Sequence, residues 1–236
     1  MNIITDDGFV GFDKQHPLKD FFDVITYDDG CFSYIPHGFC TTWKSGTPNF
    51  GTFHVGKCTG IGLGSECKYD TDAQGLKIGR FVSIGQRCRF ILSGQHPTEY
   101  VSTNRLSFWG MQEPPTRIPG DTILENDIWM GDEVMVLGGA KICNGVVVGA
   151  RSLVTHSQVL EPYGFYAGSP AKLKRLRFKD SVIRALLESE WWKYDIKHLK
   201  QVQPYFSMNL NGDDTGHVLE ALDQMSQILK SLQATP

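Results

Sequence analysis

The sequence has no run of about 18 apolar residues, so no membrane-spanning helix is expected. The segment from Met1 to Asp7 carries neither a basic stretch nor an apolar stretch, which predicts no signal peptide. The chain also has no excess of positive charge: its formal net charge is −3, which argues against bulk nucleic-acid binding. These absences argue against a membrane-spanning protein and against a general nucleic-acid binder.

The cysteines form no Cys-x-x-Cys pair. One of them, Cys88, falls in a repeat position, described below, where small apolar side chains belong. We interpret the six cysteines as reduced thiols that pack as small hydrophobic residues, which indicates a reducing cytoplasm. Disulfide bonding and zinc binding stay open as alternatives.

Signatures of metal and serine chemistry are missing as well. No two of the seven histidines are separated by three to five residues, so no local metal site is predicted. No G-x-S-x-G motif occurs, and Ser/His/Asp catalysis therefore has no support.

What the sequence does contain is a step of six residues. Aliphatic side chains recur at Leu124, Met130, Val136, Ile142, Val148 and Val154. Small or β-branched residues follow four positions later, at Ile128, Val134, Ala140, Val146 and Ser152. The same spacing appears earlier, at Val55 and Ile61 and at Ile78, Ile84 and Phe90.

A period of six fits neither an α-helix, with its period near 3.6, nor a half-buried strand, with its period of 2. Three six-residue faces joined by tight turns make one triangular coil of a parallel β-helix, and the coils stack to bury a shared core. The repeat therefore predicts an all-β core in the form of a hexapeptide-repeat prism.

The rest of the chain is organised around this prism. Residues 1–50 show no repeat and are interpreted as an irregular N-terminal cap with short strands. The prism is expected over 51–170, with an aperiodic loop at about 91–122. A loop of that length in a compact domain is usually functional. Residues 171–236 are expected to form a helical extension, with one helix ending near Trp191-Trp192 and another near the C-terminus.

His96 in the long loop is the candidate catalytic residue. Its imidazole can take a proton from a hydroxyl group as that oxygen attacks a thioester. The spacing does not choose between Glu99, Glu113 and a backbone carbonyl as the group that orients it.

A candidate cofactor groove follows from the stacking. One coil is three hexapeptides, so Gly131, Gly149 and Ala167, spaced by 18 residues, are expected to form a column. Small side chains there leave backbone amides accessible to a long chain such as pantetheine. The alternative is that glycine only eases the turn at a corner.

A basic cluster follows the column: Lys172, Lys174, Arg175, Arg177 and Lys179. These side chains could contact the phosphates of coenzyme A. The alternative is an ordinary solvated surface.

Four segments in this order resemble the hexapeptide-repeat acetyltransferases, namely the chloramphenicol and streptogramin acetyltransferases and related sugar O-acetyltransferases. The segments are Leu76–Gly85, Asp121–Ile123 leading into Asn126–Gly131, Tyr166–Lys172, and the helix that ends in Trp191-Trp192.

The resemblance implies a left-handed parallel β-helix, a homotrimer with active sites between subunits, and acetyl-CoA lying along the prism. It assigns His96, shortly before Ser102 and Thr103, as the catalytic base. The acetyl-CoA region corresponds to Trp129, Gly131, Gly149, Ala150, Ala167, Lys172 and Arg175. The acceptor region corresponds to Tyr34, Ser102 and Thr103.

These observations together predict a cytoplasmic acetyl-CoA-dependent O-acetyltransferase that uses no metal. The spacing after His96, and the Asn104 that follows Thr103, look more like the sugar relatives, so the expected acceptor is a hydroxyl of a sugar or glycan precursor. The alternatives are acetylation of an antibiotic such as chloramphenicol, a trimeric scaffold without activity, and a zinc-dependent hydratase on the same fold.

Overall fold

A computed structural model describes most of the chain. The described residues are 3–41, 51–69, 74–115, 118–212 and 214–233. Parts of the expected cap (42–50), loop (116–117) and helical extension (234–236) therefore lie outside the described residues.

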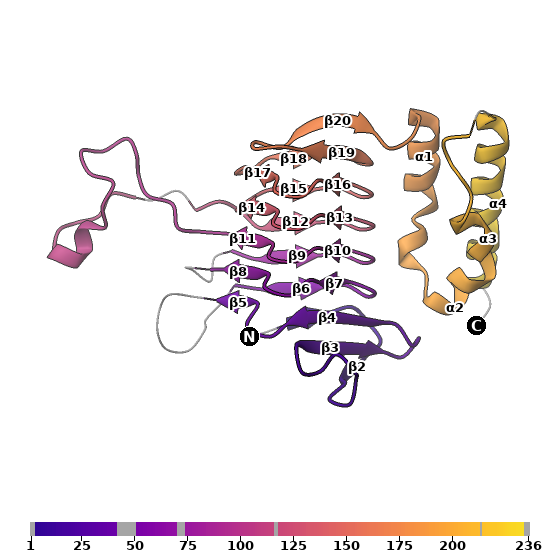
Figure 1. The fold of residues 1–236 in the computed structure, drawn as a ribbon, viewed down its shortest axis with the longest axis horizontal. Coiled ribbons are helices and arrows are strands. Elements are labelled where there is room, and N and C mark those ends of the chain that lie inside the picture. Colours follow the sequence, from indigo (N-terminus) through magenta and orange to yellow (C-terminus); the bar gives the residue numbers. More distant parts are fainter. Residues whose placement is uncertain (1–2, 42–50, 70–73, 116–117, 213, 234–236) are drawn as a thin grey trace.

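Three sheets with parallel pairing between successive coils form a prism (Figure 1). The first sheet runs in the order β1 (Ile3–Thr5), β6 (Phe53–Val55), β9 (Leu76–Ile78), β12 (Thr122–Leu124), β15 (Lys141–Ile142) and β18 (Val159–Leu160). The second runs β2 (Phe9–Phe12), β3 (Phe22–Tyr27), β4 (Phe32–Pro36), β7 (Gly60–Ile61), β10 (Ser83–Ile84), β13 (Trp129–Met130), β16 (Val147–Val148), β19 (Gly164–Ala167) and β20 (Lys172–Leu176). The third runs β17 (Leu153–Val154), β14 (Met135–Leu137), β11 (Arg89–Ile91), β8 (Glu66–Lys68) and β5 (Cys40–Thr41). Each coil contributes one strand to each sheet, which confirms the predicted architecture of a left-handed β-helix.

The six-residue repeat marks the core of the prism. Every aliphatic position from Leu124 to Val154 is at most 1 % exposed, and so is every position four residues later, from Ile128 to Ser152. Each aliphatic side chain buried in this way contributes about 1.5–3 kcal/mol relative to an exposed one. Cys88 is fully buried in the same stack, as its repeat position predicts.

The N-terminal segment is more regular than the expected cap. β1 pairs in parallel with β6, β4 with β7, and β5 with β8, so this segment adds one strand to each of the three sheets. β2, β3 and β4 pair antiparallel with one another and extend the second sheet at this end. The added strands cover the open edge of the first full coil, which would otherwise expose unpaired backbone groups.

One pair of cysteines differs from the expectation of reduced thiols. Cys31 and Cys58, 27 residues apart, form a disulfide between the N-terminal layer and the first coil. The other four cysteines form no disulfide. Sequence spacing gave no indication of this pair because the two thiols meet only when the layers stack.

The expected helical extension over 171–236 begins with a strand, β20, and is helical from Asp180 onward. The helical part comprises α1 (Asp180–Ser189), the 3-10 turn η2 (Trp191–Lys193), α2 (Ile196–Leu199), η3 (Lys200–Val202), α3 (Gln203–Phe206) and α4 (Thr215–Gln233). These elements share a second hydrophobic cluster with Tyr163 and Phe81 from turns of the prism. None of the helices in the described part of the chain has the length and apolar character needed to cross a membrane.

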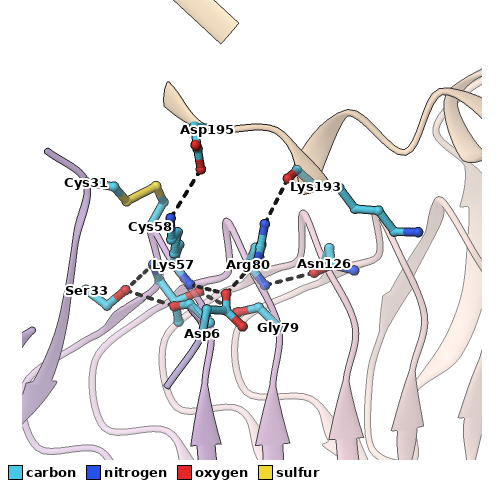
Figure 2. Close-up of polar contacts among 12 residues, drawn as sticks. Asp6, Cys31, Ser33, Lys57, Cys58, Gly79, Arg80, Asn126, Lys193 and Asp195 are labelled. Atoms are coloured by element: carbon cyan, nitrogen blue, oxygen red, sulfur yellow. Dashed lines mark hydrogen bonds and ion pairs between the residues drawn. A yellow bond between two sulfur atoms is a disulfide. The ribbon is translucent and has the colours of Figure 1, made fainter. Parts of the chain in front are cut away.

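Polar contacts also join the helical extension to the first coils (Figure 2). Lys57, buried at a prism corner, donates to Asp195 Oδ1 at 3.2 Å, and Arg80 donates to the carbonyl of Lys193 at 3.0 Å. Asp6 accepts from the backbone N–H of Lys57 at 2.9 Å and from Arg80 Nε at 2.7 Å. One network therefore connects the N-terminal layer, the prism and the helices.

Candidate functional site

The long loop leaves the third sheet after β11 and returns to the first sheet at β12. It protrudes from the side of the prism and carries the 3-10 helix η1 (Leu106–Trp109) (Figure 1). His96 lies in its first part, with its side chain exposed.

A backbone carbonyl orients the imidazole of His96. The Nδ1 atom lies 2.5 Å from the carbonyl oxygen of Thr103. A carbonyl oxygen only accepts hydrogen bonds, so Nδ1 must carry the proton in this arrangement. Nε2 then holds a free lone pair, which is the tautomer that a general base needs.

The two carboxylates that the sequence left open make other contacts. Glu99 accepts from the backbone N–H of Thr98, and Glu113 accepts from both the hydroxyl and the backbone N–H of Ser107. These hydrogen bonds from Ser107 lower the pKa of Glu113, and the positive charge of Arg105 lowers it further. Glu113 therefore adds negative potential near His96 without contacting it.

The loop folds back on itself at Ser102 and Thr103. Ser102 Oγ accepts from the backbone N–H of Asn104 at 3.1 Å, which forms a tight turn directly beside the carbonyl that holds His96. The structure thus brings Ser102 and Thr103 together with His96.

The predicted column exists in the stacked coils. Met130 pairs with Val148 and Val148 with Tyr166, so the residues that follow them, Gly131, Gly149 and Ala167, lie one above another. A Cβ on Gly131 would lie 2.7 Å from the backbone nitrogen of Ala150, whereas the nearest neighbour of a Cβ on Gly149 would be the Ala167 Cβ, at 3.2 Å. Close stacking of the coils therefore requires glycine at 131. At position 149, glycine means that no side chain projects from the outer surface of the prism.

The remaining acetyl-CoA candidates flank this column. Trp129 is 57 % exposed on β13, two residues before Gly131, and Ala150 is exposed directly after Gly149. On the exposed strand β20, Lys172 pairs with Ala167, and the Arg175 guanidinium lies over the Phe165 ring at 5.4 Å from its centroid. Lys172 is therefore beside the end of the column.

The basic cluster divides into two parts. Arg177 forms an ion pair with Asp127 at 3.3 Å and donates to the carbonyl of Gly145 at 2.7 Å, and Lys179 donates to Thr215 at 2.6 Å. These two cations bind other parts of the same chain. Lys172, Lys174 and Arg175 are the members of the cluster that the exposed strand presents to solvent.

Tyr34 lies away from the loop. It is part of β4 in the second sheet, its ring covers Gly60 so closely that a Cβ there would lie 2.2 Å from Cζ, and it packs edge-on against Phe22. The column lies where the second sheet turns into the third, and the loop joins the third sheet to the first. The predicted site residues therefore lie in separate parts of a single chain.

Sequence reasoning missed a group at the base of the loop. Gln95, directly before His96, contacts His156, and Gln74 contacts both ends of the loop. The stacking of residues 18 positions apart could have indicated one of these contacts. His156 follows Gly138 by 18 residues and contacts its carbonyl oxygen. Within the described ranges, no cluster of three or more His, Cys, Asp or Glu side chains is suited to hold a metal ion.

Comparison with known proteins gives the chain its family. No protein-family model matches it. It is 39 % identical over 150 residues to a chloramphenicol acetyltransferase of Klebsiella aerogenes, covering 60 % of this chain and 70 % of that protein. It is 33 % identical over 152 residues to virginiamycin A acetyltransferase of Staphylococcus aureus, covering 61 % of this chain and 67 % of the relative. Among solved structures, a hexapeptide-repeat acetyltransferase from Vibrio cholerae is 26 % identical, with a TM-score of 0.36 and coverage of 50 % of this chain and 62 % of that one.

The chain belongs to the hexapeptide-repeat acetyltransferases of the xenobiotic acetyltransferase group. It is an acetyl-CoA-dependent acetyltransferase, which confirms the enzyme class that the repeat and the motifs predicted.

Proposed function

We propose that this enzyme transfers the acetyl group of acetyl-CoA to a hydroxyl of chloramphenicol or a related antibiotic, with His96 as general base. The observation that carries the proposal is the 39 % identity over 150 residues to a chloramphenicol acetyltransferase. An antibiotic therefore replaces the sugar as the first candidate acceptor, because curated relatives at this level of identity are named for antibiotics. A sugar hydroxyl is the second candidate, favoured by the Asn104-Arg105 sequence after Thr103.

The proposed chemistry uses the tautomer inferred from the contact between His96 Nδ1 and the Thr103 carbonyl. Nε2 of His96 takes the proton of the acceptor hydroxyl while its oxygen attacks the thioester carbonyl. Backbone N–H groups stabilise the resulting oxyanion. When the tetrahedral intermediate collapses, the C–S bond breaks, and the thiolate of coenzyme A receives the proton from the imidazolium. The Thr103 carbonyl, which accepts from Nδ1, stabilises the imidazolium between these steps.

In this proposal, acetyl-CoA lies along the column. Gly131, Gly149 and Ala167 let the pantetheine chain approach the backbone, with Trp129 and Ala150 beside it. Lys172 and Arg175 contact the phosphates, because Lys172 lies at the end of the column and Arg175 lies further along the same exposed strand.

We also propose a homotrimer in which the active site lies between subunits. His96 and the column lie in separate parts of one chain, so a second chain can bring them together. The loop that carries His96 also exposes apolar side chains, among them Val101, Trp109 and Met111. Such a surface on a protruding loop is typical of an interface.

The test is acetyl-CoA-dependent thiol release with chloramphenicol, a streptogramin A compound, maltose and a nucleotide sugar as acceptors. We expect turnover with an antibiotic, reduced about 10²- to 10⁴-fold in His96→Ala. His217→Ala is the matched control, since that side chain is exposed on α4, far from the loop in sequence.

Each other outcome has one meaning. Turnover only with a sugar moves the acceptor to the second candidate. Turnover that survives in His96→Ala removes His96 as the base. Failure to bind acetyl-CoA at all contradicts the whole proposal and favours the alternative of a scaffold protein without activity.

A further inference from the structure

The first part of the loop is held by side chains from neighbouring coils. We propose that His156 is a positioning residue that fixes the backbone next to the catalytic base by accepting a hydrogen bond from Gln95. This inference rests on the proposed function, in which His96 is that base.

The tautomer of His156 follows from its two contacts. His156 lies in the turn between β17 and β18, half-buried, with Nδ1 3.1 Å from the carbonyl oxygen of Gly138. The carbonyl only accepts, so Nδ1 carries the proton and Nε2 is left as an acceptor. The amide nitrogen of Gln95 lies 2.6 Å from this Nε2 and donates to it.

A second contact fixes the ends of the loop. Gln74 is 2 % exposed and donates to the carbonyl of Leu92, at 2.5 Å, and to that of Pro119, at 3.1 Å. One amide therefore joins the outgoing and the returning strand of the loop. Asp121 adds a contact on the returning side, where it accepts from the backbone N–H of Gly75 at 2.8 Å.

Of the hydrogen bonds described above that hold the loop to the prism, the one from Gln95 to His156 is nearest to His96 along the chain. Between Leu92 and Gln95 lies Gly94, whose φ of +97° belongs to the region that favours glycine and which gives the backbone a pivot. Gln74 acts before this pivot, and Gln95 lies after it, directly before His96. The Gln95–His156 hydrogen bond therefore restrains rotation that Gln74 leaves free.

Placement matters because the base works only within hydrogen-bond distance of the acceptor proton, and a displacement of about 1 Å can cost about 100-fold in rate. A base held by a carbonyl within its own loop has the right tautomer. It has the right position only if the loop itself is fixed to the prism. We assign that fixation to His156.

The experiment compares His156→Ala, Gln95→Ala, the double variant and the control His217→Ala in steady-state acetyl transfer. We expect kcat to fall about 10- to 100-fold in both single variants, with KM for acetyl-CoA within about twofold of wild type. The double variant should be no slower than the slower single variant, because both remove the same hydrogen bond. The pH profile of kcat/KM should keep its shape, since His96 remains the base.

Hydrogen exchange supplies a readout that needs no acceptor. Amides of residues 93–104 should exchange faster in His156→Ala and Gln95→Ala, while those of the prism stay protected. Gln95 is on the protruding loop, so its variant tests the contact even if His156→Ala fails to fold.

The results separate the two proposals. Unchanged kcat and loop exchange in Gln95→Ala and His156→Ala, with His96→Ala inactive, would overturn only the positioning role. Multiplicative losses in the double variant would overturn it too, because the residues would then act independently. Activity retained by His96→Ala would overturn the proposed base, and loop exchange would then still report on the Gln95–His156 contact.

Discussion

Asp6 illustrates how a single carboxylate acts in this fold. Burial alone would raise its pKa, but hydrogen bonds from His54 and from the backbone of Lys57, together with the charge of Arg80, outweigh burial and lower the pKa to about 2 (Figure 2). The ionised form is therefore bound more favourably in the folded protein than in the unfolded chain. One residue of the N-terminal layer thus helps to hold that layer on the prism.

The pH dependence follows with a definite sign. The stabilisation by Asp6 is fully present above its unfolded-state pKa of 3.8 and is lost as pH falls towards about 2. We expect Asp6→Asn to lower the free energy of unfolding by on the order of 2 kcal/mol at neutral pH. Urea denaturation at several pH values measures this, with Asp7→Asn as control. Equal stability of Asp6→Asn and wild type at pH 6 would contradict it.

At the scale of the element, β20 connects the column to the coenzyme proposal. This strand pairs antiparallel with β19, and all of its residues are exposed. Its pairing sets Lys172 beside Ala167 at the top of the column and Arg175 over Phe165. The strand therefore presents cations where the phosphates of a coenzyme lying along the column would end.

Removing the cations of β20 tests whether this strand binds the coenzyme. We expect Lys172→Ala and Arg175→Ala each to raise KM for acetyl-CoA by about 10- to 100-fold, since a lost charge-assisted hydrogen bond costs about 1.5–3 kcal/mol, and the double variant to raise it further. kcat should change little because neither residue contacts the reacting atoms. Lys197→Ala, an exposed lysine on α2, is the control for charge. A double variant with wild-type KM would remove β20 from the coenzyme site.

At the scale of the whole molecule, one chain holds the parts of the proposed active site at separate places. The loop with His96 protrudes from the side of the prism (Figure 1). The column lies at another corner, where the second sheet turns into the third. Apolar side chains on the loop, such as Trp109 at 64 % exposed, need a partner surface. The proposed trimer would supply one at every subunit boundary.

Assembly gives the corresponding prediction. Val101→Ser combined with Trp109→Ser should shift the protein from trimer towards monomer in sedimentation velocity and lower kcat, while circular dichroism keeps the β-helix signal. Val10→Ser, which changes an exposed valine of the N-terminal layer, should leave the trimer intact. A wild-type protein that sediments as a monomer and is fully active would contradict the inter-subunit site.

The sequence by itself determined the prism. Each six-residue face must bury one aliphatic side chain, so aliphatic residues such as Leu124 and Val136 recur at steps of six. The sequence also indicated the column, since residues 18 apart must stack once the coils have three faces, and the family motifs pointed to His96. The tertiary structure decided what depends on which coils meet: the added strands of the N-terminal layer, the Cys31–Cys58 disulfide, and the two structural cations of the basic cluster. It also showed the carbonyl that orients His96 and the contact of Gln95 with His156, because hydrogen bonds between distant segments leave no periodic trace in a sequence.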